Sequence, residues 1–129
     1  MTRTRPCPKH VRLGRLRKAE QFATCARLVF DLADEATDVA DACATLAIHA
    51  GIAASDTLCC VEFGVYAAGT NHSEAISLLS SVDTGLGRDL ATLLTIKTQA
   101  GYSHEPTSLA ALTRARRAME SLVAAARAA

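Results

Sequence analysis

The sequence has few aromatic residues and no segment with the alternating pattern of a half-buried strand. Its 129 residues include three Phe, two Tyr and no Trp, whereas Ala is abundant. Strands favour β-branched and aromatic residues, while Ala favours closely packed helices. A chain of this length can bury one core of its own, so we expect a single all-helical domain without a sheet.

Familiar catalytic signatures are also missing. The chain has no phosphate-binding loop, no GxGxxG, no HExxH and no nucleophile elbow. Its five cysteines show neither CxxC spacing nor the spacing of paired Cys and His ligands, which argues against a zinc site. Cys25, Cys43 and Cys59 lie in helical apolar patterns and are expected to be small buried residues. The sequence therefore predicts no metal and no cofactor.

No stretch of the sequence has the pattern of a membrane span or of a signal peptide. The most apolar segment is residues 39–67, and it is interrupted by Asp41, His49, Asp56 and Glu62. It thus lacks the roughly 18 uninterrupted apolar residues that a span requires. The N-terminus lacks the apolar core of a signal peptide. We expect a cytoplasmic protein with no membrane partner.

The first 18 residues lack acidic side chains, although the net charge of the chain is only +1. They carry seven Lys or Arg, whereas the remainder carries seven bases and thirteen acids. Residues 1–9 contain two prolines and no apolar period, so we predict a disordered basic arm over 1–9 and a helical domain over 10–129. Two interpretations of the arm stay open: it is simply solvated, or it contacts nucleic acid or an acidic partner.

Beyond the arm, apolar residues recur with a helical period. Thr37 or Asp38, Ser73 and Ser108 are candidate N-caps, and Gly101 is a candidate C-cap. The predicted helices are 10–33, 39–67, 74–81, 86–100 and 108–127. The connections between them are short, which favours an up-and-down antiparallel four-helix bundle with a short extra helix. The Ala and Gly of the segment 39–67 would allow neighbouring helices to approach closely.

Polar side chains concentrate after the fourth predicted helix. Within nine residues lie Lys97, Tyr102, His104 and Glu105. A tight turn at Gly101 would fold His104 back toward Lys97, and such a group of side chains suits phosphate binding and proton transfer. The alternative is a lysine that interacts with the helix dipole beside an ordinary polar turn.

Two further pairs of residues are of interest. His49 and Asp56 are seven residues apart on one predicted helix and share one stripe, which either lies at an interface or borders the Lys97 loop. Asn71 and His72 follow that helix, and His72 is a candidate second imidazole supplied across a dimer. The candidate binding residues are therefore Asp56, His49, Asn71 and His72, and the candidate catalytic residues are His104, Lys97 and Tyr102.

Four phrases occur in a distinctive order: RLRKAEQFATCARLVF, DVADACATLAIHAGIAASDTLCC, NHSEAISLL and LLTIKTQAGY. Together with the last Ala/Arg-rich helix they resemble the HEPN superfamily and, more narrowly, the small single-domain HEPN-like proteins of actinobacteria. The resemblance covers residues 12–127. It implies an up-and-down four-helix bundle with a short extra helix, often dimeric through the active-site face.

Many active HEPN proteins are metal-independent endoribonucleases with an Arg, four to six residues and then a His near the start of the final helical segment. Their His takes part in proton transfer from the ribose 2′-hydroxyl, and their Arg holds the scissile phosphate. Here Arg5–x4–His10 lies in the arm, the wrong part of the fold, while the matching place holds Lys97–x6–His104. Lys keeps the charge of Arg but lacks its planar two-point grip on phosphate.

The resemblance thus implies one of two functions. We expect a HEPN-like module that acts through dimerisation and through binding of nucleotide, RNA or a partner protein, with a degenerate catalytic motif. The alternative is a metal-independent endoribonuclease, the toxin of a toxin–antitoxin pair, with His104 as base, Lys97 as phosphate clamp and Tyr102 in positioning. The expected partners are a second copy of the chain and an antitoxin or a nucleotidyltransferase.

Overall fold

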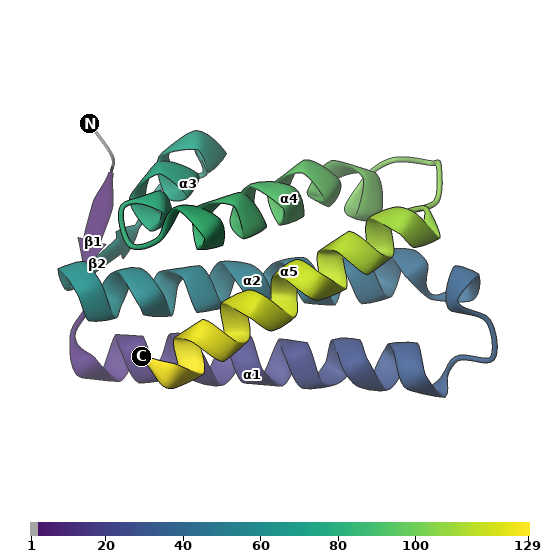
Figure 1. The fold of residues 1–129 in the computed structure, drawn as a ribbon, viewed down its shortest axis with the longest axis horizontal. Coiled ribbons are helices and arrows are strands. Elements are labelled where there is room, and N and C mark those ends of the chain that lie inside the picture. The colour runs from purple at the N-terminus through teal and green to yellow at the C-terminus, as the bar shows by residue number, and fades with distance from the viewer. Residues whose placement is uncertain (1–2) are drawn as a thin grey trace.

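The computed structural model describes residues 3–129, and over this range the chain is all-helical apart from one small two-stranded ribbon (Figure 1). The elements in chain order are β1 (Thr4–Pro6), α1 (Lys9–Leu32), a short 3-10 helix η1 (Ala36–Asp38), α2 (Ala40–Phe63), β2 (Val65–Ala67), α3 (His72–Ser80), α4 (Thr84–Gly101) and α5 (Leu109–Ala128). The predicted fold class, all-α, is therefore confirmed.

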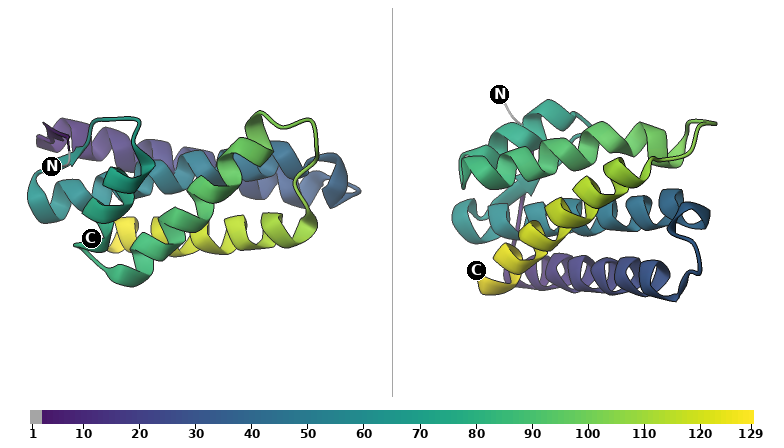
Figure 2. Two further views of the ribbon diagram at one scale, coloured as in Figure 1. Left: turned by 90° about the horizontal axis from the view of Figure 1, so that it is seen from above. Right: turned by 45° about the vertical axis from the view of Figure 1, so that its right-hand side comes forward.

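Helix α2 is the core helix of the fold. It packs against α1, α4 and α5, and most of its residues from Cys43 to Cys60 are buried. In Figure 1, α1 runs antiparallel to α2 on one side, α4 lies along the other side, and α5 crosses α2 diagonally. The two further views in Figure 2 show the same arrangement, with α3 beside the start of α4. The most apolar segment of the sequence therefore supplies the central helix of the fold.

Small residues allow the helices around α2 to approach closely. The fully buried residues of α1 are all alanines, namely Ala19, Ala23 and Ala26. At Gly51 of α2 an added Cβ would collide with the side chain of Leu93 from α4 and press on Leu122 from α5. The close packing expected from the Ala and Gly content is thus observed.

Apolar composition also gives α2 the properties of a candidate membrane span. Within residues 3–129 it is the one helix long and apolar enough to cross a membrane, with a mean hydropathy of 1.4 in its best 18-residue window. However, 67% of that window is buried inside the fold. Most of this window is therefore already covered by neighbouring elements of the fold.

Gly64 ends α2 earlier than the apolar pattern predicts. Its φ of 69° is left-handed, and its N–H donates a hydrogen bond to the carbonyl of Cys60 at 2.9 Å. Glycine adopts this conformation without steric cost and commonly terminates helices. The prediction of a helix through residue 67 is wrong, because Val65–Ala67 instead form β2.

The helix caps agree with the sequence in one case and differ in another. Ser108 caps α5 as predicted, and its Oγ accepts a hydrogen bond from the N–H of Ala111 at 3.1 Å. Helix α3 is capped by Asn71 rather than Ser73, since the Asn71 side chain accepts from the N–H of Glu74 at 3.2 Å. The helix thus begins earlier than predicted, because Asn71, two positions before Ser73, provides the cap.

Two other predicted caps are wrong. Thr37 and Asp38 belong to η1, so α2 begins after Val39 without a side-chain cap. Gly101 remains within α4, and Tyr102 is the C-cap residue, with its N–H donating to the carbonyl of Thr98. At the first place a single 3-10 turn precedes α2, and at the second α4 extends one residue beyond its predicted end.

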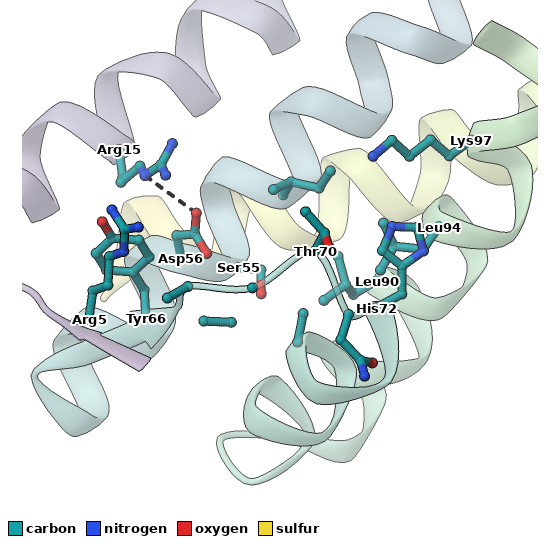
Figure 3. Close-up of a pocket in the computed structure, with 16 residues that line it drawn as sticks. Arg5, Arg15, Ser55, Asp56, Tyr66, Thr70, His72, Leu90, Leu94 and Lys97 are labelled. Carbon is teal, nitrogen blue, oxygen red and sulfur yellow. Dashed lines mark ion pairs between the residues drawn. The ribbon is translucent and has the colours of Figure 1, made fainter. Parts of the chain in front are cut away.

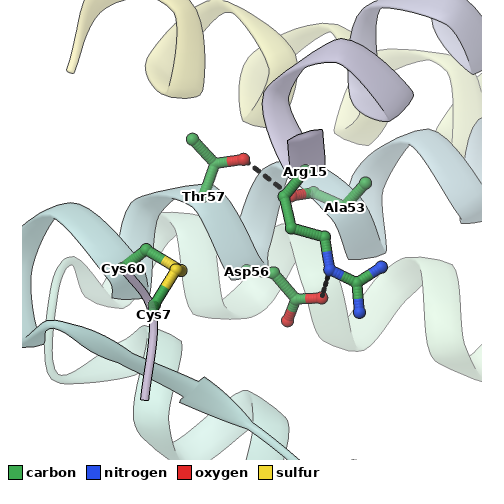
Figure 4. Close-up of a disulfide and its surroundings, with 6 residues drawn as sticks. All are labelled: Cys7, Arg15, Ala53, Asp56, Thr57 and Cys60. Carbon is green, nitrogen blue, oxygen red and sulfur yellow. Dashed lines mark hydrogen bonds and ion pairs between the residues drawn. A yellow bond between two sulfur atoms is a disulfide. The ribbon is translucent and has the colours of Figure 1, made fainter. Parts of the chain in front are cut away.

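The N-terminal segment differs most from its prediction. Thr4–Pro6 form β1, antiparallel to β2, with Arg5 opposite Tyr66. Cys7 is joined by a disulfide to Cys60 near the end of α2 (Figure 4). The predicted disordered arm and the expected absence of strands are therefore wrong for residues 3–9, because strand pairing and a covalent link fix them. Residues 1 and 2 of the predicted arm lie outside the described residues.

Three cysteines are free. Cys43 and Cys59 are buried as predicted, and the Cys43 Sγ donates a hydrogen bond to the carbonyl of Ala26 at 3.4 Å. Burial raises the pKa of the Cys59 thiol to about 12, so it stays neutral. The prediction that Cys25 is buried is wrong, because it lies on the exposed face of α1.

Candidate functional site

A cavity of about 360 Å³ opens between the β1–β2 ribbon, α1, α2, α4 and the connection from β2 to α3 (Figure 3). Its volume lies in the range of pockets that bind small molecules. The apolar part of its wall includes Ile52 of α2 and Leu90 and Leu94 of α4. The polar part is contributed by residues distant in sequence, so the fold alone brings them together. We call this space the ribbon cavity.

Positive charge dominates the ribbon cavity. Its lining includes Arg5 from β1, Arg15 from α1 and Lys97 from α4. Among its lining residues that the structure describes, Asp56 is the one carboxylate. Three cations in one partly enclosed space attract an anion, and guanidinium groups suit phosphate and carboxylate oxygens in particular.

Asp56 lies in the wall of the cavity on α2. Its Oδ2 is 3.3 Å from Nε of Arg15, and its side chain is only 12% exposed (Figures 3 and 4). Burial raises the pKa of this carboxyl to about 6, against the opposing effect of the Arg15 charge. Near neutral pH the carboxylate is therefore poised to gain a proton, which would leave Arg15 without its charge partner.

Tyr66 supports the guanidinium of Arg15. The Arg15 Cζ lies 5.3 Å from the centre of the Tyr66 ring, within the range of a cation–π contact. Arg5 is opposite Tyr66 in the ribbon, so both arginines and the phenol lie at the same end of the cavity. Figure 3 shows this group together with Asp56.

The other part of the cavity is lined by Lys97, Asn71 and His72. Figure 3 shows His72 near Lys97, with Thr70 between them and the Arg15 end. Asn71 is the N-cap of α3, and His72 is the first residue of that helix. The start of α3 and the Lys97 ammonium therefore face the same space.

The structure brings together four of the residues that the sequence singled out: Lys97, Asp56, Asn71 and His72 line the ribbon cavity. His49 and Tyr102 do not line it. They share with Lys97 a separate pocket of about 190 Å³. The His49 ring lies 5.6 Å from the ring of Phe22, measured between centroids. Lys97 thus borders both pockets, so it adjoins both the residues of the ribbon cavity and the pair His49 and Tyr102.

His104 lines neither the ribbon cavity nor the pocket beside Tyr102. Its side chain is 93% exposed, and its Nε2 lies 3.9 Å from Oε1 of Glu105. The following loop is held by Gln99, whose Nε2 donates to the carbonyl of Glu105 at 2.6 Å. The expected tight turn at Gly101 is not formed, because Gly101 is a residue of α4, and the His104 side chain lies in solvent.

Sequence reasoning missed Arg5, Arg15 and Tyr66. Arg15 lies in a helix rich in exposed bases, so nothing in its local pattern distinguishes it from Arg17. Tyr66 follows the glycine that ends α2, and Arg5 lies in the segment assigned to a disordered arm. Only the pairing of β1 with β2 would have pointed to them, and strands of three residues carry no readable period.

Among residues 3–129 no group of three or more His, Cys, Asp or Glu side chains is arranged to hold a metal ion. In comparisons with known proteins, no protein-family model matches the chain and no curated protein matches it in sequence.

Proposed function

We propose that the protein is a HEPN-like helical module that binds a phosphate-bearing ligand, a nucleotide or a short stretch of RNA, in the ribbon cavity. One observation carries this proposal. Arg5, Arg15 and Lys97 line the same cavity of about 360 Å³, and Asp56 is the one acid among its described lining residues. Such an excess of positive charge is costly unless an anion is bound or solvent enters.

The other lining residues suit a nucleotide better than an isolated inorganic anion. The wall combines apolar side chains such as Leu90 and Leu94 with a phenol, Tyr66. Apolar and aromatic surface accommodates a base or a sugar, while the cations take the phosphate. The hydroxyls of Ser55 and Thr70 are further hydrogen-bonding groups in the lining.

The helix order supports the HEPN part of the proposal. Four long helices, α1, α2, α4 and α5, and the short α3 follow one another in the order expected for an up-and-down bundle with an extra helix. In this account the protein acts in the cytoplasm as a homodimer, with an antitoxin or a nucleotidyltransferase as a further partner. The homodimer and the two partners follow from the resemblance of the sequence phrases, whereas the helix order supports the fold.

A metal-independent endoribonuclease is the second candidate function. Lys97 favours it, because a cation in the lining of a nucleotide-sized cavity can stabilise the charge of a scissile phosphate. The exposed position of His104 argues against it, since a general base must reach the proton it removes. We therefore rank binding above catalysis.

The test is calorimetric titration of the protein with adenosine 5′-monophosphate and with a uridine tetranucleotide. Arg15→Gln and Lys97→Gln should each weaken binding by about tenfold or more, because each removes a charge-assisted contact to phosphate. Arg17→Gln and Arg88→Gln are matched controls, since both are exposed residues of the same two helices outside the cavity lining. Equal losses of affinity in all four variants would indicate nonspecific attraction of the anion to positive charge and would contradict the proposal.

A further inference from the structure

Arg5 reaches the ribbon cavity from a segment with few attachments. Strand β1 is three residues long and pairs only with β2, which is equally short. Backbone hydrogen bonds extend the pairing at each end, from Ala68 N–H to the Arg3 carbonyl and from Cys7 N–H to the Gly64 carbonyl. An isolated two-stranded ribbon of this size is marginally stable in water.

Besides the short link from β1 into α1, the Cys7–Cys60 disulfide is a covalent cross-link of this segment to the body of the fold. Cys60 is 5% exposed in the last turn of α2, whereas Cys7 is half-buried and lies two residues after Arg5. The bond joins positions 53 residues apart in sequence. It therefore holds β1, and with it Arg5, against the end of the helix that carries Asp56 (Figure 4).

We propose that the Cys7–Cys60 disulfide is a redox control of the ribbon cavity: the oxidised form holds Arg5 in the anion site, and reduction releases β1 and weakens binding of the phosphate-bearing ligand. This inference rests on the proposed binding function. In a reducing cytoplasm, disulfides that form are transient and commonly regulatory, which suits such a control.

The chemical step is thiol–disulfide exchange with a low-molecular-weight thiol. A thiolate of that class attacks Sγ of Cys7, the more accessible sulfur, and forms a mixed disulfide while Cys60 leaves as a thiolate that takes a proton. A second molecule of the same thiol attacks the mixed disulfide and releases the Cys7 thiol. In sum, the protein disulfide gains two electrons and two protons, and two thiols are oxidised to one small disulfide.

Release of β1 changes the cavity in a defined way. Arg5 is lost from the lining, and Tyr66 loses its strand partner. Arg15 and Lys97 stay, because they belong to α1 and α4. Reduction should thus lower affinity without abolishing it, by about tenfold for the loss of one charge-assisted phosphate contact.

The experiment compares oxidised and reduced protein in a Cys25→Ser background, which removes the exposed thiol. Adenosine 5′-monophosphate and the uridine tetranucleotide are titrated into both forms, and amide hydrogen exchange is followed in β1 and β2. Circular dichroism verifies that the reduced form keeps its helices, and Cys7→Ser provides a second disulfide-free form that leaves the buried Cys60 in place. The arginine is tested by Arg5→Gln in both redox states.

We expect reduction to weaken binding by about tenfold and to speed exchange in β1, and we expect Arg5→Gln to remove the redox difference. Equal affinities in the two redox states would overturn the redox inference and leave the binding function intact. Absence of binding by the oxidised protein to either probe would overturn both. A redox difference that persists undiminished in Arg5→Gln would also overturn the inference, because the control would then not act through that residue.

Discussion

The Nε of Arg15 lies 3.3 Å from Oδ2 of Asp56, and this ion pair joins α1 to α2 in the wall of the ribbon cavity. The charge of Arg15 does not offset the burial of the carboxylate, since the pKa of Asp56 is raised to about 6. The pair therefore contributes more to ligand binding than to the stability of the fold. An incoming anion can take over Arg15 when Asp56 is protonated.

The first prediction concerns the pH dependence of stability. The pKa of Asp56 is raised in the folded protein from an ordinary 3.8 to about 6, so its protonated form is favoured by folding. Its contribution to the free energy of unfolding is full below pH 3.8 and is lost as the pH rises through about 6. The loss is on the order of 3 kcal/mol.

Urea unfolding of the wild type and of Asp56→Asn from pH 3.5 to 8 measures this effect. The wild type should lose more stability over that interval than the variant, which has no carboxyl to titrate at this position. Parallel pH profiles of the two proteins would contradict the placement of a buried carboxyl at residue 56.

The second prediction concerns the pH dependence of binding. Affinity for the uridine tetranucleotide should rise as the pH falls through about 6, because protonation of Asp56 removes the negative charge of the cavity and frees Arg15. A phosphodiester probe keeps its own charge over this range. Calorimetry at pH 5 and pH 7.5 tests the effect, with Asp56→Asn as control. An equal rise in the variant would contradict the assignment of the effect to Asp56.

The third prediction concerns packing around α2. Gly51→Ala should destabilise the protein by about 1–3 kcal/mol, because the new methyl group meets Leu93 in a closely packed core. Gly14→Ala is the matched control, since nothing lies within 4 Å of its added Cβ and it is inside α1. That change should stabilise by about 0.5–1 kcal/mol through helix propensity. Thermal unfolding of both variants measures the two effects. A Gly51→Ala protein more stable than the Gly14→Ala protein would contradict the close packing of Gly51 against Leu93.

The fourth prediction separates binding from catalysis. Single-stranded RNA incubated with the protein in EDTA should stay intact, because the exposed His104 lies outside the lining of the cavity that holds Lys97. His104→Ala should leave affinity for the uridine tetranucleotide unchanged. Cleavage that is lost in His104→Ala, with helical content preserved, would instead establish the endoribonuclease.

The sequence was sufficient to predict elements with a long apolar period. The helix predicted over 10–33 is observed as Lys9–Leu32, and that over 108–127 as Leu109–Ala128. The end of α2 was missed because Val65 and Tyr66 continue the apolar run beyond Gly64, and only the left-handed φ of that glycine reveals the change of direction. The spacing of apolar residues carries no information about the backbone angle of one glycine.

The candidate site was predictable only in part, for a related reason. Lys97, Asp56, Asn71 and His72 attracted attention through their chemistry, and the fold places them in one cavity. The other half of the site depends on contacts between distant segments, such as Arg5 opposite Tyr66. The disulfide that holds this half was equally hidden, because five cysteines of irregular spacing allow many pairings.

The most direct test of the central claim is to locate the bound ligand by amide chemical-shift mapping of the labelled, oxidised protein during titration with adenosine 5′-monophosphate. Our account predicts shifts that saturate and that cluster on residues 66–72 and around Arg5, Arg15, Asp56 and Lys97, with α5 unaffected near Arg117. Saturating shifts centred elsewhere, or small shifts spread over all exposed arginines, would contradict the assignment of the ribbon cavity as the binding site.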